Sequence, residues 1–134
     1  MQMNYDQQSL LIAQLMNASS QSDHGDGYIA QHPELRNRDV IKWTLGQATM
    51  FRDHYRELIS DKPSFTLSRE EKLQLAKDKL QLAFNLAAVA FILGGEIRDS
   101  ELGAQAAEFI ANTAEETGDK ETAHKWKLTA LALR

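Results

Sequence analysis

A run of apolar residues from Leu82 to Leu93 constrains the fold more than any other feature of the chain. Asn85 is the one polar residue within this run, so a helix formed here would have no face suited to water. A helix that is apolar on all sides has to be covered by other elements. The run is also well short of the about 20 apolar residues that a membrane-spanning helix needs. We therefore predict the central helix of a small soluble bundle.

The composition is that of one helical domain. Of the 134 residues, 43% are hydrophobic and 25% are charged, as in ordinary globular proteins. Good helix formers dominate, and seven glycines and two prolines leave few turn residues for a fold of many strands. We expect residues 1–134 to form a single all-α domain, a compact bundle of about five helices.

Several classes of function are disfavoured by what the chain lacks. It contains no cysteine, which excludes disulfides and thiolate metal sites. It opens without the basic residues and long apolar core of a signal peptide, so we expect a cytoplasmic location. Its net charge of −4 arises within residues 1–35, and the remaining residues balance 15 acids against 15 bases. No basic excess is present for nucleic acid, and we expect neither a membrane partner nor a cofactor.

Local signals set the helix boundaries. Ser68, Asp99 and Asp119 are suited to N-caps, and Ser68 also precedes Glu71 as in a capping box. Gly94-Gly95 and Gly118 are suited to left-handed C-caps. With the 3.6-residue periodicity of the apolar residues, these signals predict helices over residues 5–18, 37–60, 68–93, 99–116 and 119–133. Residues 19–36, rich in Ser, Asp and Gly, are expected to form a long loop.

The last two predicted helices are complementary in shape and charge. The fourth carries a stripe of small residues and is acidic, whereas the fifth is mostly basic. The stripe consists of Ala104, Ala107, Ala111 and Ala114. We expect it to pack closely against Ala123, Trp126, Ala130 and Leu133, and we expect this packing to stabilise the hairpin more than exposed ion pairs do.

Residues 106–133 resemble a tetratricopeptide-repeat hairpin. The matching positions are Ile110-Ala111, the Gly118-Asp119 turn, Ala123 and Ala130 seven residues apart, and the ending Leu131-x-Leu133. The resemblance covers about a fifth of the chain, has Ala107 and Ala114 where the family has aromatic residues, and finds no second copy 34 residues earlier. An ordinary αα-hairpin that uses alanine is the alternative. If it holds, the resemblance implies helical hairpins that serve as a protein-binding surface.

The function that we infer from the sequence is that of a small protein–protein interaction module, such as an adaptor, inhibitor or regulator. We expect another protein as its partner and the C-terminal hairpin as the contact region. The candidate anchors are Phe109, Trp126 and Lys127, because Trp and charged neighbours are frequent at binding hot spots. A homodimer would also help to cover the third helix, which is apolar all round.

A metal-dependent nucleotide hydrolase is one alternative. Glu70-Glu71 and Glu96-x-x-Asp99 superficially resemble the carboxylates of all-α nucleotide pyrophosphohydrolases of the MazG type, which hold Mg²⁺ between adjacent helices. The third carboxylate expected there is replaced by Gln74. Glu71 and Glu96 would also lie at opposite ends of one helix, about 37 Å apart at 1.5 Å per residue, so they are not expected to share a metal ion.

Two further alternatives have weak sequence support. Residues 45–52 faintly resemble the turn and recognition helix of a helix-turn-helix DNA-binding regulator, although the turn is too short. A continuous helix through Gly46 is the other interpretation. A loop metal site at Asp23, His24, Asp26 and His32 lacks the short histidine spacings of known zinc motifs, and a polar surface loop is preferred.

Overall fold

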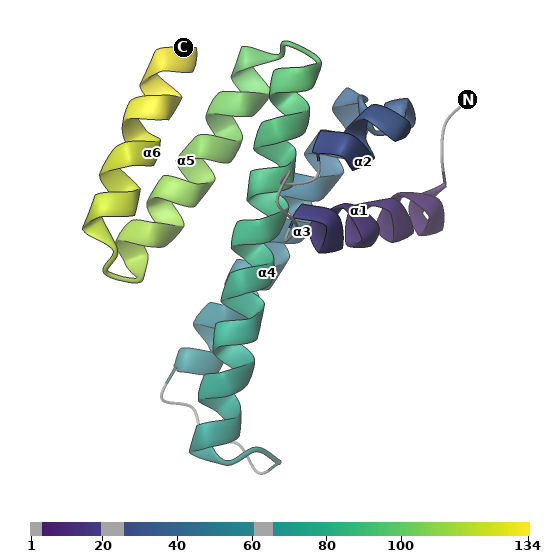
Figure 1. Ribbon diagram of the computed structural model, residues 1–134. Coiled ribbons are helices and arrows are strands. Elements are labelled where there is room, and N and C mark those ends of the chain that lie inside the picture. Colours follow the sequence, from purple (N-terminus) through teal and green to yellow (C-terminus); the bar gives the residue numbers. More distant parts are fainter. Residues whose placement is uncertain (1–3, 20–25, 61–65) are drawn as a thin grey trace.

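The protein is an all-α bundle in which a long central hairpin separates two smaller groups of helices. The computed structural model describes residues 4–19, 26–60 and 66–134 (Figure 1). The central hairpin consists of α3 (Arg38–Ile59) and α4 (Arg69–Glu96). The hairpin of α5 (Ser100–Glu116) and α6 (Lys120–Leu133) lies on one side of it, and α1 (Tyr5–Ser19) and α2 (Asp26–Gln31) lie on the other.

The apolar run of α4 is the centre of the core, as the sequence predicts. Leu86, Val89 and Leu93 are at most 3% exposed, and they pack in one cluster with residues of α1, α3 and α5. The N-cap of α4 is Ser68, whose hydroxyl accepts a hydrogen bond from the backbone N–H of Glu71 at 3.1 Å. On α3, Val40, Ile41 and Ala48 are buried against α4.

The α5–α6 hairpin confirms the expected packing of small residues. The whole stripe Ala104, Ala107, Ala111 and Ala114 is buried, as are Ala123 and Ala130 on α6. Gly118, at a φ of 88°, ends α5, and the Asp119 carboxylate caps α6 by accepting a hydrogen bond from the Thr122 N–H. Because alanine leaves little side chain between the helices, their backbones can approach closely.

The segment predicted as a long loop contains helical structure. Residues 26–31 form α2 and Pro33–Leu35 form a 3₁₀ turn, so the described part of the chain has six α-helices rather than five. Ile29 and Leu35 are 1% and 0% exposed, and their burial stabilises turns that the local sequence disfavours. The loop interpretation is therefore wrong for these residues, and residues 20–25 lie outside the described part.

The end of α4 also differs from the prediction. The helix does not stop at Leu93 but continues through Gly94-Gly95 to Glu96. The residue with the left-handed conformation is Arg98, at a φ of 56°. Around it the Arg98 N–H donates to the Gly95 carbonyl and the Asp99 N–H donates to the Gly94 carbonyl, which is the Schellman pattern. The carbonyls of the two glycines accept the hydrogen bonds of this cap, but the left-handed residue is Arg98 and not a glycine.

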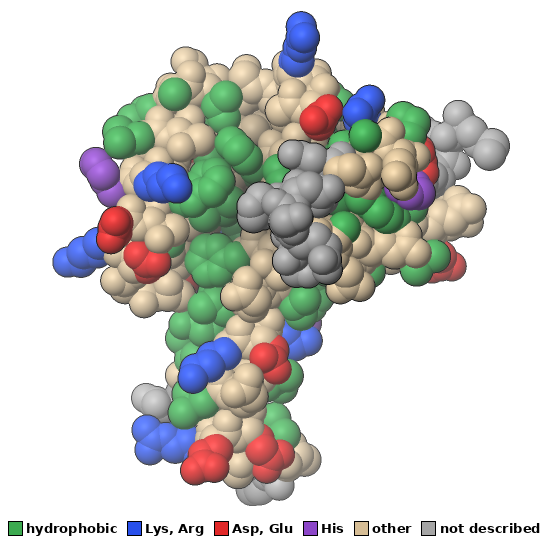
Figure 2. All heavy atoms as spheres, in the orientation of Figure 1, with side chains coloured by type: hydrophobic (Ala, Val, Ile, Leu, Met, Phe, Trp, Pro, Cys, Tyr) green, Lys and Arg blue, Asp and Glu red, His purple; other side chains and the backbone are tan. Residues whose placement is uncertain are grey.

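The outer part of the central hairpin extends beyond all other helices. We call residues 55–60 and 66–79 the stalk; Figures 1 and 2 show it projecting from the rest of the molecule. Ala76 is the one buried residue among them. Ile59 and Leu73 are nearly half exposed, although they continue the apolar faces that are buried further along α3 and α4.

Candidate functional site

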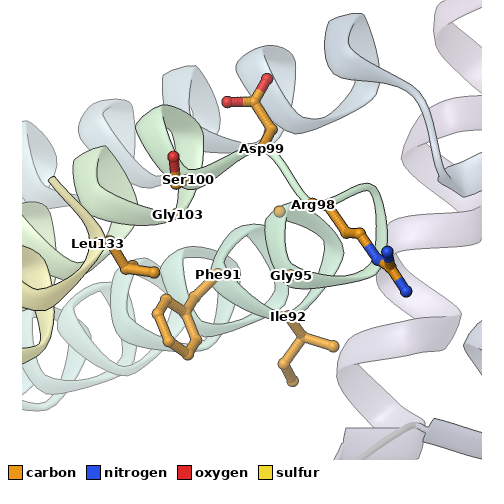
Figure 3. A pocket seen from close by; sticks show the side chains of 9 residues that line it. Phe91, Ile92, Gly95, Arg98, Asp99, Ser100, Gly103 and Leu133 are labelled. Carbon is orange, nitrogen blue, oxygen red and sulfur yellow. The ribbon is translucent and has the colours of Figure 1, made fainter.

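A pocket lies where α4, α5 and α6 meet. Its volume is about 390 Å³, which lies within the range of small ligand sites. The lining comes from the end of α4, the turn into α5, the first turn of α5 and the end of α6 (Figure 3). The lining residues are Phe91, Ile92, Gly94, Gly95, Arg98, Asp99, Ser100, Gly103 and Leu133.

Two glycines determine how closely the helices around the pocket approach. A Cβ added to Gly94 would lie 3.1 Å from the backbone nitrogen of Gly103 and 3.3 Å from its Cα. The two helices therefore touch backbone to backbone at this point. A Cβ added to Gly103 would lie 3.2 Å from Cδ1 of Leu133, so α6 also packs against this contact.

Large apolar side chains form the walls. Phe91 and Ile92 project from α4 toward the same side, and Leu133 points toward Phe91 from α6 (Figure 3). The Phe91 ring packs against the Trp126 ring of α6 in an edge-to-face arrangement, with 5.0 Å between the ring centroids. This geometry is favourable for aromatic pairs, and it fixes one wall of the pocket to α6.

The space above Gly95 is open. No heavy atom lies within 4 Å of a Cβ added at this position, and Gly95 is exposed. Figure 2 shows green side chains gathered between the α5–α6 hairpin and α4 on the face in view. The apolar residues that line the pocket, Phe91, Ile92 and Leu133, are only partly buried.

The carboxylates next to the pocket are already paired. Asp99 forms an ion pair with Arg38 and caps α5 through the Leu102 N–H, and Glu96 lies 3.5 Å from Arg36. Arg98 lines the pocket but makes no ion pair with any described residue. Glu101, in the first turn of α5, likewise makes no ion pair with any described residue, so the two unpaired charges at this end of the bundle are of opposite sign.

The three anchors predicted from the sequence occupy different environments. Phe109 is 9% exposed, and the guanidinium carbon of Arg52 lies 4.8 Å from its ring centroid. It is therefore part of the core and offers little surface to a partner. Trp126 is half-buried behind Phe91. Lys127 is exposed and forms an ion pair with Glu115 at 2.6 Å, which holds the pKa of that carboxyl below its ordinary value.

The described residues form neither the carboxylate metal site nor the helix-turn-helix considered from the sequence. Glu71 and Glu96 lie in the first and last turns of the single helix α4, so they cannot ligate one ion. Helix α3 runs without interruption through Gly46, which excludes a helix-turn-helix there.

The loop metal site considered from the sequence is only partly described. His32 contacts Glu34 at 3.0 Å, whereas Asp23, His24 and the side chain of Asp26 lie outside the described part. Among the described residues, no three His, Asp or Glu side chains are grouped as a metal site requires.

Comparisons with known proteins leave the pocket as the main guide to function. No protein-family model, curated protein or solved structure matches the chain. Across the described ranges, no helix combines the length and hydropathy needed to cross a membrane.

The pocket itself was not predicted from the sequence. Phe91 and Ile92 were recognised as core residues of the apolar run, but their position at an opening depends on where α6 docks. Gly94 and Gly95 were interpreted as a helix end. A paired glycine inside a long apolar helix, followed by Gly103 in the next helix, is a signal of close helix contact that could have indicated the site.

Proposed function

We propose that this protein is a small cytoplasmic interaction module, an adaptor or regulator, that binds another protein through the pocket between α4, α5 and α6. The observation that carries the proposal is an open pocket with Phe91, Ile92 and Leu133 as its walls. A buried apolar side chain supplied by a partner contributes about 1.5–3 kcal/mol to binding when it is fully removed from water. In this proposal the α5–α6 hairpin, whose sequence resembles a tetratricopeptide repeat, supplies one side of the pocket.

The polar groups around the pocket favour binding over catalysis. The one carboxylate among the lining residues, Asp99, is engaged by Arg38 and by the first turn of α5. A general acid or base needs a free group with a suitable pKa within reach of the substrate. The lining residues instead combine apolar walls with polar groups at the rim, which is the usual make-up of a recognition site.

The test is to fill the pocket without disturbing the fold. Gly95→Leu places a side chain in the open space above α4, and leucine is a better helix former than glycine. Gly46→Leu is the matched control, because Gly46 also lies inside a helix with no heavy atom within 4 Å of an added Cβ. Gly46 lies in α3 and is not among the residues that line the pocket.

The three proteins would be tagged and used to capture partners from a lysate of the native host, with stoichiometry read by native mass spectrometry. We expect one stoichiometric protein partner with the wild-type chain and Gly46→Leu, and at least a tenfold loss with Gly95→Leu. Equal capture by all three would overturn the assignment of the pocket. Recovery of a bound nucleotide or metal ion without a protein partner would overturn the proposed function itself.

A further inference from the structure

Helix α4 carries a row of apolar side chains that the other described helices leave partly uncovered. Leu73 and Leu80 are seven residues apart and Phe84 follows four residues later, so the three side chains lie on one side of the helix. We call them the α4 stripe. Further along the same side, Phe91 packs against Trp126 of α6. Leu73, in contrast, is 48% exposed, and Leu80 and Phe84 are half-buried.

The uncovered end of the stripe lies where the stalk projects. Figure 1 shows α3 as the one described helix beside this part of α4, and Figure 2 shows hydrophobic side chains there among acidic and basic ones. The burial of Ala76 and the position of the Lys79 ammonium, 5.1 Å from the centroid of the Phe51 ring, show which side of α4 faces α3. By helical spacing Leu73 lies next to that side and not beneath α3. Another chain can therefore reach it.

Two residues of opposite charge flank Leu73. Glu70 lies three residues before it and Lys77 lies four residues after it, so both project from the same side of α4 as Leu73. Both side chains are exposed. Neither forms an ion pair with any described residue.

The other charged residues of α4 within the stalk point elsewhere. By the same helical spacing, Glu71 and Asp78 lie on the side of α4 opposite the stripe, and Lys72 and Lys79 lie toward α3. Arg69 begins the helix at the edge of the stripe nearest α3. The edge of the stripe away from α3 therefore presents one acid followed, two turns later, by one base.

We propose that this protein forms a homodimer in which the stalks of two copies pack side by side and antiparallel through the α4 stripe. A two-fold axis beside Leu73 places the two Leu73 side chains together and brings Glu70 of each copy opposite Lys77 of the other. A second copy suits this pattern because the two-fold axis exchanges the two positions and forms the ion pair twice. A surface of a single sign would attract one of these residues and repel the other.

The length of the stalk allows this arrangement. Pairing about that axis aligns Leu80 of one copy with Leu67 of the other, so the overlap covers about 20 Å along the stalk. It ends before Phe91, where α6 packs against α4. The remaining helices of the two copies then lie at opposite ends of the overlap. Because the overlap is short, the contact falls at the small end of interface sizes, and we expect a dissociation constant in the micromolar range.

Charge reversal tests the pairing. The full chain and its variants would be examined by sedimentation velocity over a range of micromolar concentrations. Glu70→Lys and Lys77→Glu each place like charges opposite one another twice, so each should weaken the dimer about tenfold or more. The double variant Glu70→Lys/Lys77→Glu restores opposite charges in exchanged positions, and it should dimerise about as tightly as the wild-type chain.

Glu71→Lys is the matched control. Glu71 also lies in the first turn of α4, so its replacement loses the same favourable interaction with the helix N-terminus as Glu70→Lys does. Because Glu71 lies on the opposite side of the helix, the dimer should be unchanged. The double variant keeps the loss at Glu70, so its recovery cannot be explained by the stability of the fold. Hydrogen exchange in the stalk should also slow as the protein concentration rises, because the second copy covers it.

Three results would overturn the inference. A wild-type chain that stays monomeric at millimolar concentration would show that the stripe does not self-associate. A dimer that both single variants leave intact would use another surface. A double variant as weak as the single variants would exclude the antiparallel pairing of Glu70 with Lys77. The pocket is not involved in any of these measurements, so capture of a partner by the wild-type chain and by Gly95→Leu tests the proposed function separately.

Discussion

The adjacent glycines Gly94 and Gly95 should respond in opposite directions to the same substitution. Both lie inside α4, so replacement by alanine gains about 0.5–1 kcal/mol of unfolding free energy at either position through reduced backbone entropy. At Gly95 the added Cβ meets nothing within 4 Å, and the full gain is expected. At Gly94 it meets the backbone nitrogen of Gly103 at 3.1 Å and its Cα at 3.3 Å.

Backbone atoms cannot move aside as a flexible side chain can, so Gly94→Ala forces α5 away from α4. Overpacking of this kind costs about 1–3 kcal/mol. After the gain in backbone entropy is subtracted, Gly94→Ala should lower the unfolding free energy by about 0.5–2 kcal/mol. The two variants should then differ by about 1–3 kcal/mol, or roughly 4–12 °C in melting temperature for a chain of this length.

Thermal and urea unfolding followed by circular dichroism would measure both values. Gly46→Ala calibrates the gain in backbone entropy, because Gly46 lies in the middle of α3 with open space around an added Cβ. It should stabilise the protein as much as Gly95→Ala does. Equal stabilisation by Gly94→Ala would refute the backbone contact between α4 and α5, and with it the described shape of the pocket floor.

Three further predictions concern single side chains. Thr113 is 0% exposed and its hydroxyl has no hydrogen-bond partner among the described residues, so Thr113→Val should raise the unfolding free energy by about 1 kcal/mol in urea titrations. Hydrogen bonds from Thr122 hold the pKa of the Asp119 carboxyl below its ordinary value. The stability gained from that carboxylate should therefore be present at neutral pH and decline as the pH falls below about 4, in melting curves measured against pH. Trp126→Ala removes the edge-to-face contact with Phe91 and should cost about 1–3 kcal/mol without unfolding the protein.

Each of these has a matched control. The Thr44 hydroxyl donates to the Val40 carbonyl at 2.7 Å, so Thr44→Val should stabilise less than Thr113→Val. The reverse order would contradict the conclusion that the Thr113 hydroxyl is buried without a hydrogen-bond partner. Asp119→Asn keeps a good N-cap residue but should lose the acid dependence, and an unchanged pH profile would rule out Asp119 as its source. Trp126→Phe keeps an aromatic ring, so a loss as large as that of the alanine variant would argue against the contact with Phe91.

The sequence was sufficient for features that depend on near neighbours in the chain. The N-caps at Ser68, Asp99 and Asp119 each bond to a backbone N–H three residues later, so their partners are visible in the sequence. The alanine stripe of α5 follows from helical periodicity alone. The same is true of the continuous helix through Gly46.

Features that depend on distant residues were missed. Gly94-Gly95 has the local pattern of a helix end, but the contact with Gly103 keeps Gly94 inside the helix. Helix α2 contains Gly27 and follows several turn formers, so its formation reflects the burial of Ile29 rather than local preference. Phe109 is a candidate anchor in the sequence, and its low exposure, with Arg52 of α3 over its ring, could not be read from local pattern.

The projecting stalk implies an order in which the protein opens. Backbone amides there are protected mainly by hydrogen bonds within α3 and α4, because Ala76 is the one buried residue of the stalk. Helices with little tertiary packing are marginally stable in water, and such regions exchange amide hydrogens through local openings. The stalk should therefore lose its hydrogen-exchange protection first, while Leu86 and Leu93 in the centre of α4 exchange only when the whole domain unfolds. One helix would then span both a weakly and a strongly protected region of the described structure.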